Sequence, residues 1–235
     1  MTSLDHRPSH IDHRLAILGG TFDPIHCGHI AAAVAVRDAL RIARVLVVPS
    51  NVPPHRTIQP MASSFHRFAM AALAVSGLPG LEANDDELRS GGPSYTADTL
   101  DRLRGRGLAA SQIFFITGAD AFAEIATWKR YPDVLDLANF VVVSRPGSSL
   151  HDLPARLPAL AGRMRPASAA GPGDDSPSIY LLNAQTPDVS STSVRARLAR
   201  GESIRGLVPA LVETHIQQHG LYSAAAAANQ LHGKD

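Results

Sequence analysis

Short, continuous apolar runs alternate along this chain with longer stretches in which apolar residues recur at helical spacing. The apolar runs are residues 15–20 (LAILGG), 44–50 (RVLVVPS), 112–118 (QIFFITG), 139–145 (NFVVVSR) and 179–183 (IYLLN). Runs of this length without polar alternation are typical of strands that are covered on both faces. The pattern therefore predicts five buried strands.

The stretches between these runs have the spacing of helices. They include residues 29–41, 63–77 and the TADTL segment at 96–100, and two final helices at 192–201 and 209–220, the last stopped by Gly220. Strand followed by helix, repeated, favours parallel strands joined by right-handed crossovers. We predict an α/β fold, a doubly wound, Rossmann-like parallel sheet with a small C-terminal helical part.

The two ends of the chain lack this periodicity. Residues 1–13 are polar and dotted with histidines, which predicts a flexible N-terminal arm, and residues 223–235 predict a frayed C-terminal tail. The 14–222 region between them is expected to form a single domain. Within it, residues 165–178 (RPASAAGPGDDSPS) are rich in Pro, Gly, Ser and Ala and predict a surface loop between two strands.

Composition narrows the class of protein. Of 235 residues, 22 are Lys or Arg and 21 are Asp or Glu, so a net charge of +1 gives no field that would gather a nucleic acid. The single cysteine, Cys27, cannot form an internal disulfide, which favours a reducing, cytoplasmic location. No apolar run approaches the ~20 residues that a membrane span needs. Self-association into a homo-oligomer is compatible with the sequence.

The first strand ends in an unusual turn, LAILGGTFDPIHCGHI. In a parallel sheet, ligands collect at the carboxyl ends of strands, where helix N-termini present free N–H groups. Gly19 and Gly20 are expected to let a ligand approach the backbone there. His26 and His29 are one helical turn apart, so both imidazoles can lie on one side of the helix start and donate hydrogen bonds to phosphate oxygens.

Other interpretations of this turn stay open on the residues alone. The two histidines are also compatible with a helix cap that lines a core. A zinc site is less favoured because no Glu lies between them and no third ligand is near in the sequence. Cys27, between the histidines, is either a small filler or a thiol made reactive by the helix N-terminus.

The stretch GGTFDPIHCGHI resembles the signature of the nucleotidylyltransferase superfamily, whose HxGH element binds the phosphates of a nucleoside triphosphate. The resemblance implies that ATP contacts this segment. The residues it assigns to ATP here are Gly19, Gly20, Thr21, Phe22, His26 and His29.

A second stretch, DVSSTSVRARL at residues 188–198, has hydroxyl residues at helix-cap positions followed by an arginine. An ordinary capped helix with a basic face would look the same. The stretch also resembles the superfamily's (I/V)SSTxxR element, which implies that Ser191, Thr192 and Arg195 hold the distal phosphates of ATP. His26, His29 and Arg195 are then the expected catalytic residues.

Five further motifs appear in order: PSNVPPHR (49–56), GPSYTADTL (92–100), ITGAD (116–120), Trp128 and SRPG (144–147). Together they are similar to the bacterial nicotinate-nucleotide adenylyltransferases. The resemblance implies transfer of the adenylyl group of ATP to nicotinate mononucleotide, giving deamido-NAD and pyrophosphate. It also implies that Mg²⁺ travels with the ATP phosphates, so no metal ligand is assigned to the protein.

The same resemblance implies a site for nicotinate mononucleotide. An electron-poor pyridine ring with a carboxylate suits an aromatic stack and backbone donors at a helix start. A stiff loop after the second strand would hold the phosphate. The residues expected to bind the mononucleotide are His55, Arg56, Tyr95, Thr96, Gly118, Asp120, Trp128 and Arg145.

The sequence disfavours three rival functions. Another adenylyl- or cytidylyltransferase of the superfamily is disfavoured by GPSYTADTL and Trp128. A nucleotide sensor without catalysis would be expected to lose a phosphate-binding residue, yet His26, His29 and Arg195 are present. A dinucleotide-dependent dehydrogenase is disfavoured because the first turn lacks the third glycine of GxGxxG.

Overall fold

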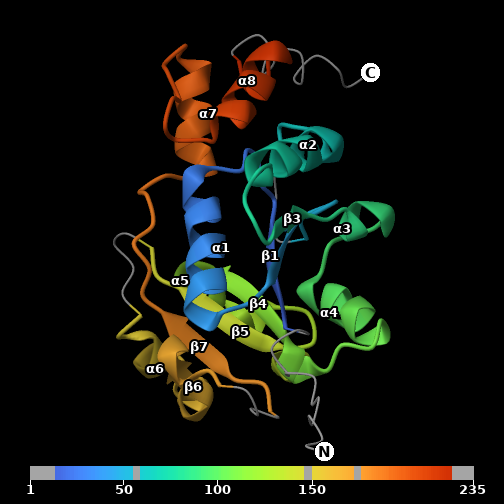
Figure 1. Ribbon diagram of the computed structural model, residues 1–235, viewed down its shortest axis with the longest axis vertical. Helices are drawn as coiled ribbons and strands as arrows, with labels where there is room; N and C mark the ends of the chain where they lie inside the picture. The colour runs from blue at the N-terminus through green and yellow to red at the C-terminus, as the bar shows by residue number, and fades with distance from the viewer. Residues whose placement is uncertain (1–13, 55–58, 146–149, 172–175, 224–235) are drawn as a thin grey trace, which may run out of the picture.

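The chain forms a seven-stranded, entirely parallel sheet, seen in the computed structural model, which describes residues 14–54, 59–145, 150–171 and 176–223 (Figure 1). The order across the sheet is β3-β2-β1-β4-β5-β7-β6. The strands are β1 (Leu15–Gly20), β2 (Arg44–Pro49), β3 (Leu81–Ala83), β4 (Ile113–Gly118), β5 (Asn139–Val143), β6 (Met164–Pro166) and β7 (Ile179–Leu182).

Helices follow most of the strands. The α-helices are α1 (Cys27–Leu40), α2 (Ser64–Val75), α3 (Asp86–Arg89), α4 (Thr96–Gly105), α5 (Ala119–Ala123), α6 (Leu153–Arg156), α7 (Ser191–Ala199) and α8 (Ala210–Gln218). Short 3-10 turns lie at Ala110–Gln112, Ile125–Thr127, Asp133–Asp136, Pro158–Arg163 and Ala167–Ala169. In the described part of the chain, no helix combines the length and apolar character needed to cross a membrane.

The sheet separates two apolar cores. Alternate residues of β1 face opposite sides, with Ala16 and Leu18 in one core and Ile17 in the other. The first core is completed by residues of α1, α2 and α8, the second by residues of α4 and α5. The arrangement is therefore three layers, with helices on both faces of a buried sheet, as the continuous apolar runs predicted.

All five predicted strands are confirmed, with ends that differ by two residues at most. Two strands were not predicted. β3 pairs with β2, and β6 pairs with β7 at the far edge of the sheet. The prediction of one surface loop over residues 165–178 was wrong at its start, because β6 continues to Pro166 and Ala167 is buried.

The strand order places a crevice at the centre of the sheet. From β1 the chain moves outward to β2 and β3, then returns to the other side of β1 with β4. Loops after β1 and β4 therefore diverge, and ligands of doubly wound folds bind at this point. The predicted arm (1–13) and residues 224–235 of the predicted tail lie outside the described residues, so the division into arm, domain and tail stays a prediction.

Candidate active site

The loop between β1 and α1 is fixed by a buried carboxylate. Asp23 is 2% exposed, and its two carboxylate oxygens accept hydrogen bonds from the backbone N–H groups of Met61 and Ala62 at 2.9 and 3.0 Å. The hydroxyl of Tyr222 donates to the same carboxylate at 2.8 Å. Burial and the Asp23 charge raise the pKa of Tyr222, so the phenol keeps its proton. The last described turn of the chain thus holds the loop between β1 and α1, called the first loop below.

A buried arginine on α2 joins the loops that follow β1 and β2. The guanidinium of Arg67, 1% exposed, donates to the carbonyls of Thr21 (2.8 Å) and Ser50 (2.6 Å). It also donates to the carbonyls of Asn51 and Ala62. Sequence analysis missed Arg67. The available signal was its position, since it falls on the buried face of α2 with Met70, Ala71 and Ala74.

The glycines of the first turn make room for side chains of the protein. A Cβ on Gly20 would lie 2.7 Å from the Phe22 ring, and a Cβ on Gly19 would lie 3.3 Å from the Phe115 ring. The left-handed backbone conformation falls on Phe22, with φ of 51°. In the direction of a Cβ, aromatic rings therefore fill the space beside both glycines, and the approach of a ligand to their backbone stays a prediction.

His26 and His29 lie face to face at the start of α1. Their ring centroids are 3.6 Å apart with an interplanar angle of 24°, and the Phe22 ring packs at nearly a right angle to the His29 ring. The backbone N–H of His26 donates to Nδ1 of His29 at 3.2 Å. Because Nδ1 accepts, the neutral His29 ring carries its proton on Nε2, which is left as a hydrogen-bond donor.

His26 holds a buried polar atom without a partner. Its ring is 2% exposed, and Nδ1 forms no hydrogen bond with any described residue. A Cβ on Gly28 would lie 3.1 Å from this atom and 3.3 Å from a methyl carbon of Val189. The lack of a side chain at Gly28, the glycine of HxGH, therefore leaves room for the His26 ring.

Burial and one arginine control the charge of both rings. Burial, followed by the positive charge of Arg145, lowers the pKa of His26 from 6.5 to about 4. Burial, His26 and Arg145 lower the pKa of His29 well below its usual range. Both imidazoles are consequently neutral at pH 7. They can donate N–H hydrogen bonds without repelling the positive charge of Arg145.

These rings line a pocket of about 330 Å³, the histidine pocket. Arg145 also lines it and forms an ion pair with Asp120, with Nη1 3.2 Å from the carboxylate oxygen. Residues from the ends of β4 and β5 and from the segment before α7 complete the wall. The full lining is Leu18, His26, Gly28, His29, Ala32, Ile116, Thr117, Gly118, Asp120, Val143, Ser144, Arg145, Thr186, Pro187, Asp188, Val189 and Ser190.

The start of α7 contacts the first loop from the other end of the chain. The hydroxyl of Ser191 donates to the carbonyl of Pro24 at 2.9 Å. Arg195 donates from Nη1 to the carbonyl of Asp23 at 2.5 Å and from Nη2 to the hydroxyl of Thr192 at 3.3 Å. The two signatures thus meet, yet Arg145, and not Arg195, is the arginine that lines the histidine pocket.

A second cavity of about 350 Å³, the tryptophan pocket, lies across α5 from the first. Asp120 of α5 lines the histidine pocket and its neighbour Ala121 lines the tryptophan pocket. Trp128 packs edge-on against Phe115, with ring centroids 6.0 Å apart. The lining of the tryptophan pocket is Ser94, Tyr95, Thr96, Ala97, Ala121, Glu124, Thr127, Trp128 and Lys129.

The predicted site residues divide between these places. His26, His29, Gly118, Asp120 and Arg145 line the histidine pocket, whereas Tyr95, Thr96 and Trp128 line the tryptophan pocket. Among described residues, Gly19, Gly20, Thr21, Phe22, Ser191, Thr192 and Arg195 support the first loop or lie beside it, outside both linings. His55 and Arg56 lie outside the described residues.

Cys27 lacks the environment of a reactive thiol. Its backbone N–H donates to the carbonyl of Leu207 at 2.9 Å, so the helix N-terminus is already satisfied there. Burial raises the pKa of the Cys27 thiol. The raised pKa favours the filler over a nucleophilic thiolate.

Comparison with known proteins assigns the chain to a family. The Cytidylyltransferase-like family matches residues 17–197. The "probable nicotinate-nucleotide adenylyltransferase" of Desulfatibacillum aliphaticivorans is 40% identical over 217 residues, covering 89% of this chain and 99% of that protein. The protein of the same name from Chromohalobacter salexigens is 40% identical, covering 95% of this chain and 100% of that protein.

A solved structure shares the fold. The nicotinic acid mononucleotide adenylyltransferase of Plasmodium falciparum, complexed with NaAD, has a TM-score of 0.69 at 18% identity. The match covers 89% of this chain and 97% of that chain. With HxGH at a β1/β4 crevice and relatives of nearly equal length, the chain belongs to the cytidylyltransferase-like family, within the bacterial nicotinate-nucleotide adenylyltransferases.

Proposed function

We propose that this enzyme transfers the adenylyl group of ATP to nicotinate mononucleotide, giving deamido-NAD and pyrophosphate. An oxygen of the mononucleotide's phosphate forms a bond to the α-phosphorus of ATP, and the bond from that phosphorus to the pyrophosphate oxygen breaks. The single observation that carries the proposal is the stacked His26–His29 pair, which lines a pocket at the β1/β4 crevice.

The histidine pocket is proposed to hold ATP. Nε2 of His29 supplies a neutral donor, the neutral His26 ring lines the pocket beside it, and Arg145 adds a permanent positive charge. Donors of this kind accelerate transfer by stabilising the charge that develops on the phosphoryl oxygens. The incoming phosphate is already ionised at neutral pH, so the reaction needs no general base.

Arg195 is proposed to act on the leaving pyrophosphate from the edge of the histidine pocket. Its guanidinium is held by the carbonyl of Asp23 and the hydroxyl of Thr192 in the structure. Five N–H donors are present on a guanidinium, so donors remain for phosphate oxygens. Ser191 and Thr192, at the start of α7, are proposed to contribute the N-terminal end of that helix.

Mg²⁺ is proposed to arrive with the ATP phosphates and to neutralise part of their charge. Two carboxylates line the histidine pocket, Asp120 and Asp188, and the first is already paired with Arg145. Such a sparse donor set suits an ion that keeps its waters and phosphate ligands. Asp120 is placed to accept a hydrogen bond from a metal-bound water or a ribose hydroxyl.

The tryptophan pocket is proposed to hold the nicotinate ring. Trp128 and Tyr95 offer aromatic faces, and the start of α4 at Thr96 offers backbone N–H groups to the ring carboxylate. Because neighbouring residues of α5, Asp120 and Ala121, line the two pockets, the mononucleotide would lie along α5 with its phosphate toward His26. Gly118, at the end of β4, would lie beside that path.

The test is coupled pyrophosphate release from ATP with three acceptors: nicotinate mononucleotide, its amide counterpart and phosphopantetheine. We expect the highest kcat/KM with nicotinate mononucleotide. Activity only with phosphopantetheine would replace the substrate with that of another transferase of the superfamily. Tight binding of preformed NAD without pyrophosphate release would favour a sensor. The enzyme is proposed to act in the cytoplasm, without a nucleic-acid or membrane partner.

A further inference from the structure

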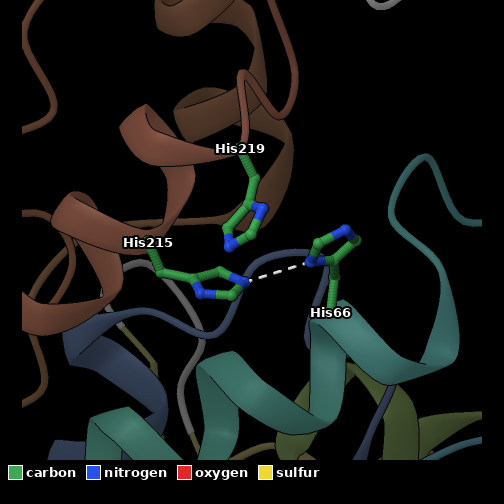
Figure 2. Close-up of side chains that lie close together, drawn as sticks. All are labelled: His66, His215 and His219. Atoms are coloured by element: carbon green, nitrogen blue, oxygen red, sulfur yellow. Dashed lines mark hydrogen bonds between the residues drawn. The ribbon is translucent and has the colours of Figure 1, made fainter.

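Three histidines gather where α2 meets α8, away from both pockets (Figure 2). His66 lies in the first turn of α2, His215 in the last turns of α8, and His219 is the C-cap residue directly after α8. Nδ1 of His66 lies 3.1 Å from Nε2 of His215. One nitrogen of each ring can be chosen so that all three lie within 4.8 Å of one another.

The packing of the two helices fixes this arrangement. Met70 and Ala71 of α2 and Val212 and Ile216 of α8 are buried in the same core. On α8, residues four apart share a face, so His215 and His219 point to the same side. Gly220, with φ of +60°, ends the helix directly after His219. The ring positions therefore follow from rigid elements rather than from loops.

The separations suit a tetrahedral metal ion. With metal–nitrogen bonds of about 2.0–2.1 Å, two ligand atoms of a tetrahedral site lie about 3.4 Å apart. The His66–His215 separation of 3.1 Å is close to that edge. His219 is exposed and caps the helix, so its ring can turn to complete the set. A hydrogen bond between two rings would account for His66 and His215 but not for the third.

The close spacing of the three rings disfavours a positive charge on each of them. The ring centroids of His219 lie 4.9 Å from His66 and 4.4 Å from His215. Three protonated imidazoles at this spacing would repel one another. Burial, and then the neighbouring His219 and His66, lower the pKa of His215. Neutral imidazoles offer the lone pairs that Zn²⁺ and related ions bind.

We propose that His66, His215 and His219 form a binding site for a divalent transition metal ion, with Zn²⁺ as the expected occupant. Water would complete the tetrahedron, since His219 lies at the surface. None of the three residues lines either pocket, so the ion would serve the structure rather than adenylyl transfer. It would link α8, the last described helix, to α2, which carries Arg67 and so supports the first loop.

The experiment is calorimetric titration of Zn²⁺ into the chelator-treated full-length protein. The variants are His215→Ala and His219→Gln. Because His6, His10 and His13 in the first residues can also bind Zn²⁺, a matched control replaces those three with alanine. We expect one tight site per chain in the wild type and in this control. Both α8 variants should bind at least roughly a hundredfold more weakly, because even supporting residues of metal sites cost 10- to 100-fold.

Two further measurements separate a built site from surface binding. Co²⁺ in place of Zn²⁺ should give the intense visible bands of a four-coordinate ion, and these should be absent from His215→Ala. Zn²⁺ at a hundredfold excess over its Kd should raise Tm by about 5 to 10 °C in the wild type and the control only. Circular dichroism checks that the variants are folded. Unchanged affinity in both α8 variants, or a wild-type Kd above about 0.1 mM, would overturn the proposal.

Discussion

The two pockets on either side of α5 are built in different ways. The histidine pocket includes residues of the first loop, which buried charges hold in place. Asp23 and Arg67 each form hydrogen bonds with backbone groups of distant segments. The tryptophan pocket rests on Trp128, which packs against buried Phe115, and on contacts at the surface. Lys129 pairs with Asp98 at 2.8 Å with side chains 42% and 37% exposed, and its ammonium lies 4.5 Å from the Tyr95 ring centroid.

This difference predicts how each pocket responds to substitution. Buried hydrogen bonds to charged groups are worth about 1.5–3 kcal/mol each, whereas exposed ion pairs contribute about 0–1 kcal/mol. Chemistry at phosphorus needs donors fixed to fractions of an ångström, while a ring held by stacking tolerates more freedom. We therefore expect changes beneath the histidine pocket to affect stability and kcat, and changes in the tryptophan pocket to affect KM.

The largest effect is expected from Arg67→Met. The substitution leaves the carbonyls of Thr21 and Ser50 without their buried donor, so the free energy of unfolding should fall by roughly 3 to 5 kcal/mol. Urea unfolding measures it. The matched control is Arg44→Met, whose partner Glu82 lies on the surface and which should cost less than about 1 kcal/mol. Equal losses in the two variants would remove the contrast between buried and exposed support.

His29→Ala tests the chemistry of the histidine pocket. Loss of one donor to the developing charge should lower kcat by about 10²- to 10³-fold while the KM values change little. Coupled pyrophosphate release at saturating substrates measures it, and circular dichroism reports the fold. His151→Ala is the control, because that side chain is 94% exposed and lies in neither pocket lining. A variant with near-normal kcat would take His29 out of the mechanism.

The pH dependence of stability tests the burial of His26. Because its folded pKa of about 4 lies below the ordinary 6.5, the unfolded chain takes up the proton first as the pH falls. The free energy of unfolding should therefore drop between pH 6.5 and about 4, by up to roughly 3 kcal/mol from this residue, and then level off. His29 acts in the same direction.

Denaturant unfolding across that pH range supplies the measurement. His26→Asn should flatten the curve, and His151→Asn should leave it unchanged. A curve with the same slope in all three proteins would place the His26 ring in contact with water rather than in the wall of the pocket.

Much of the sheet and of the histidine pocket could be predicted because the signals are local. Apolar runs gave β1, β2, β4, β5 and β7, and HxGH placed two imidazoles on one helix start. The edge strands β3 and β6 span three residues each, too few to show a periodicity. The packing of the Phe22 ring beside Gly20 could not be predicted, because it depends on the positive φ of Phe22.

The long-range partners carried no such signal. Arg67 reaches loops on two different strands, and Tyr222 reaches Asp23 across nearly the whole chain. Arg195 was expected among the catalytic residues, and the sequence did not show that its guanidinium is bonded to Asp23 and Thr192. Such pairings follow from how layers pack, which hydrophobic periodicity does not encode. The three-histidine cluster on α2 and α8 escaped notice for the same reason.

The smallest effect is expected in the tryptophan pocket, from Trp128→Ala. Loss of an aromatic face should raise KM for nicotinate mononucleotide by up to about tenfold, since a stacking contact is worth about 0.5–1.5 kcal/mol, and should leave KM for ATP within twofold. Lys129→Ala is the control, because it removes an exposed ion pair from the same wall and should change either KM less than threefold. Initial-rate kinetics with each substrate varied in turn distinguish the two. A rise in KM for ATP alone would show that Trp128 binds the adenosine part of ATP. The two pockets would then differ in rigidity but not in the substrate that they bind.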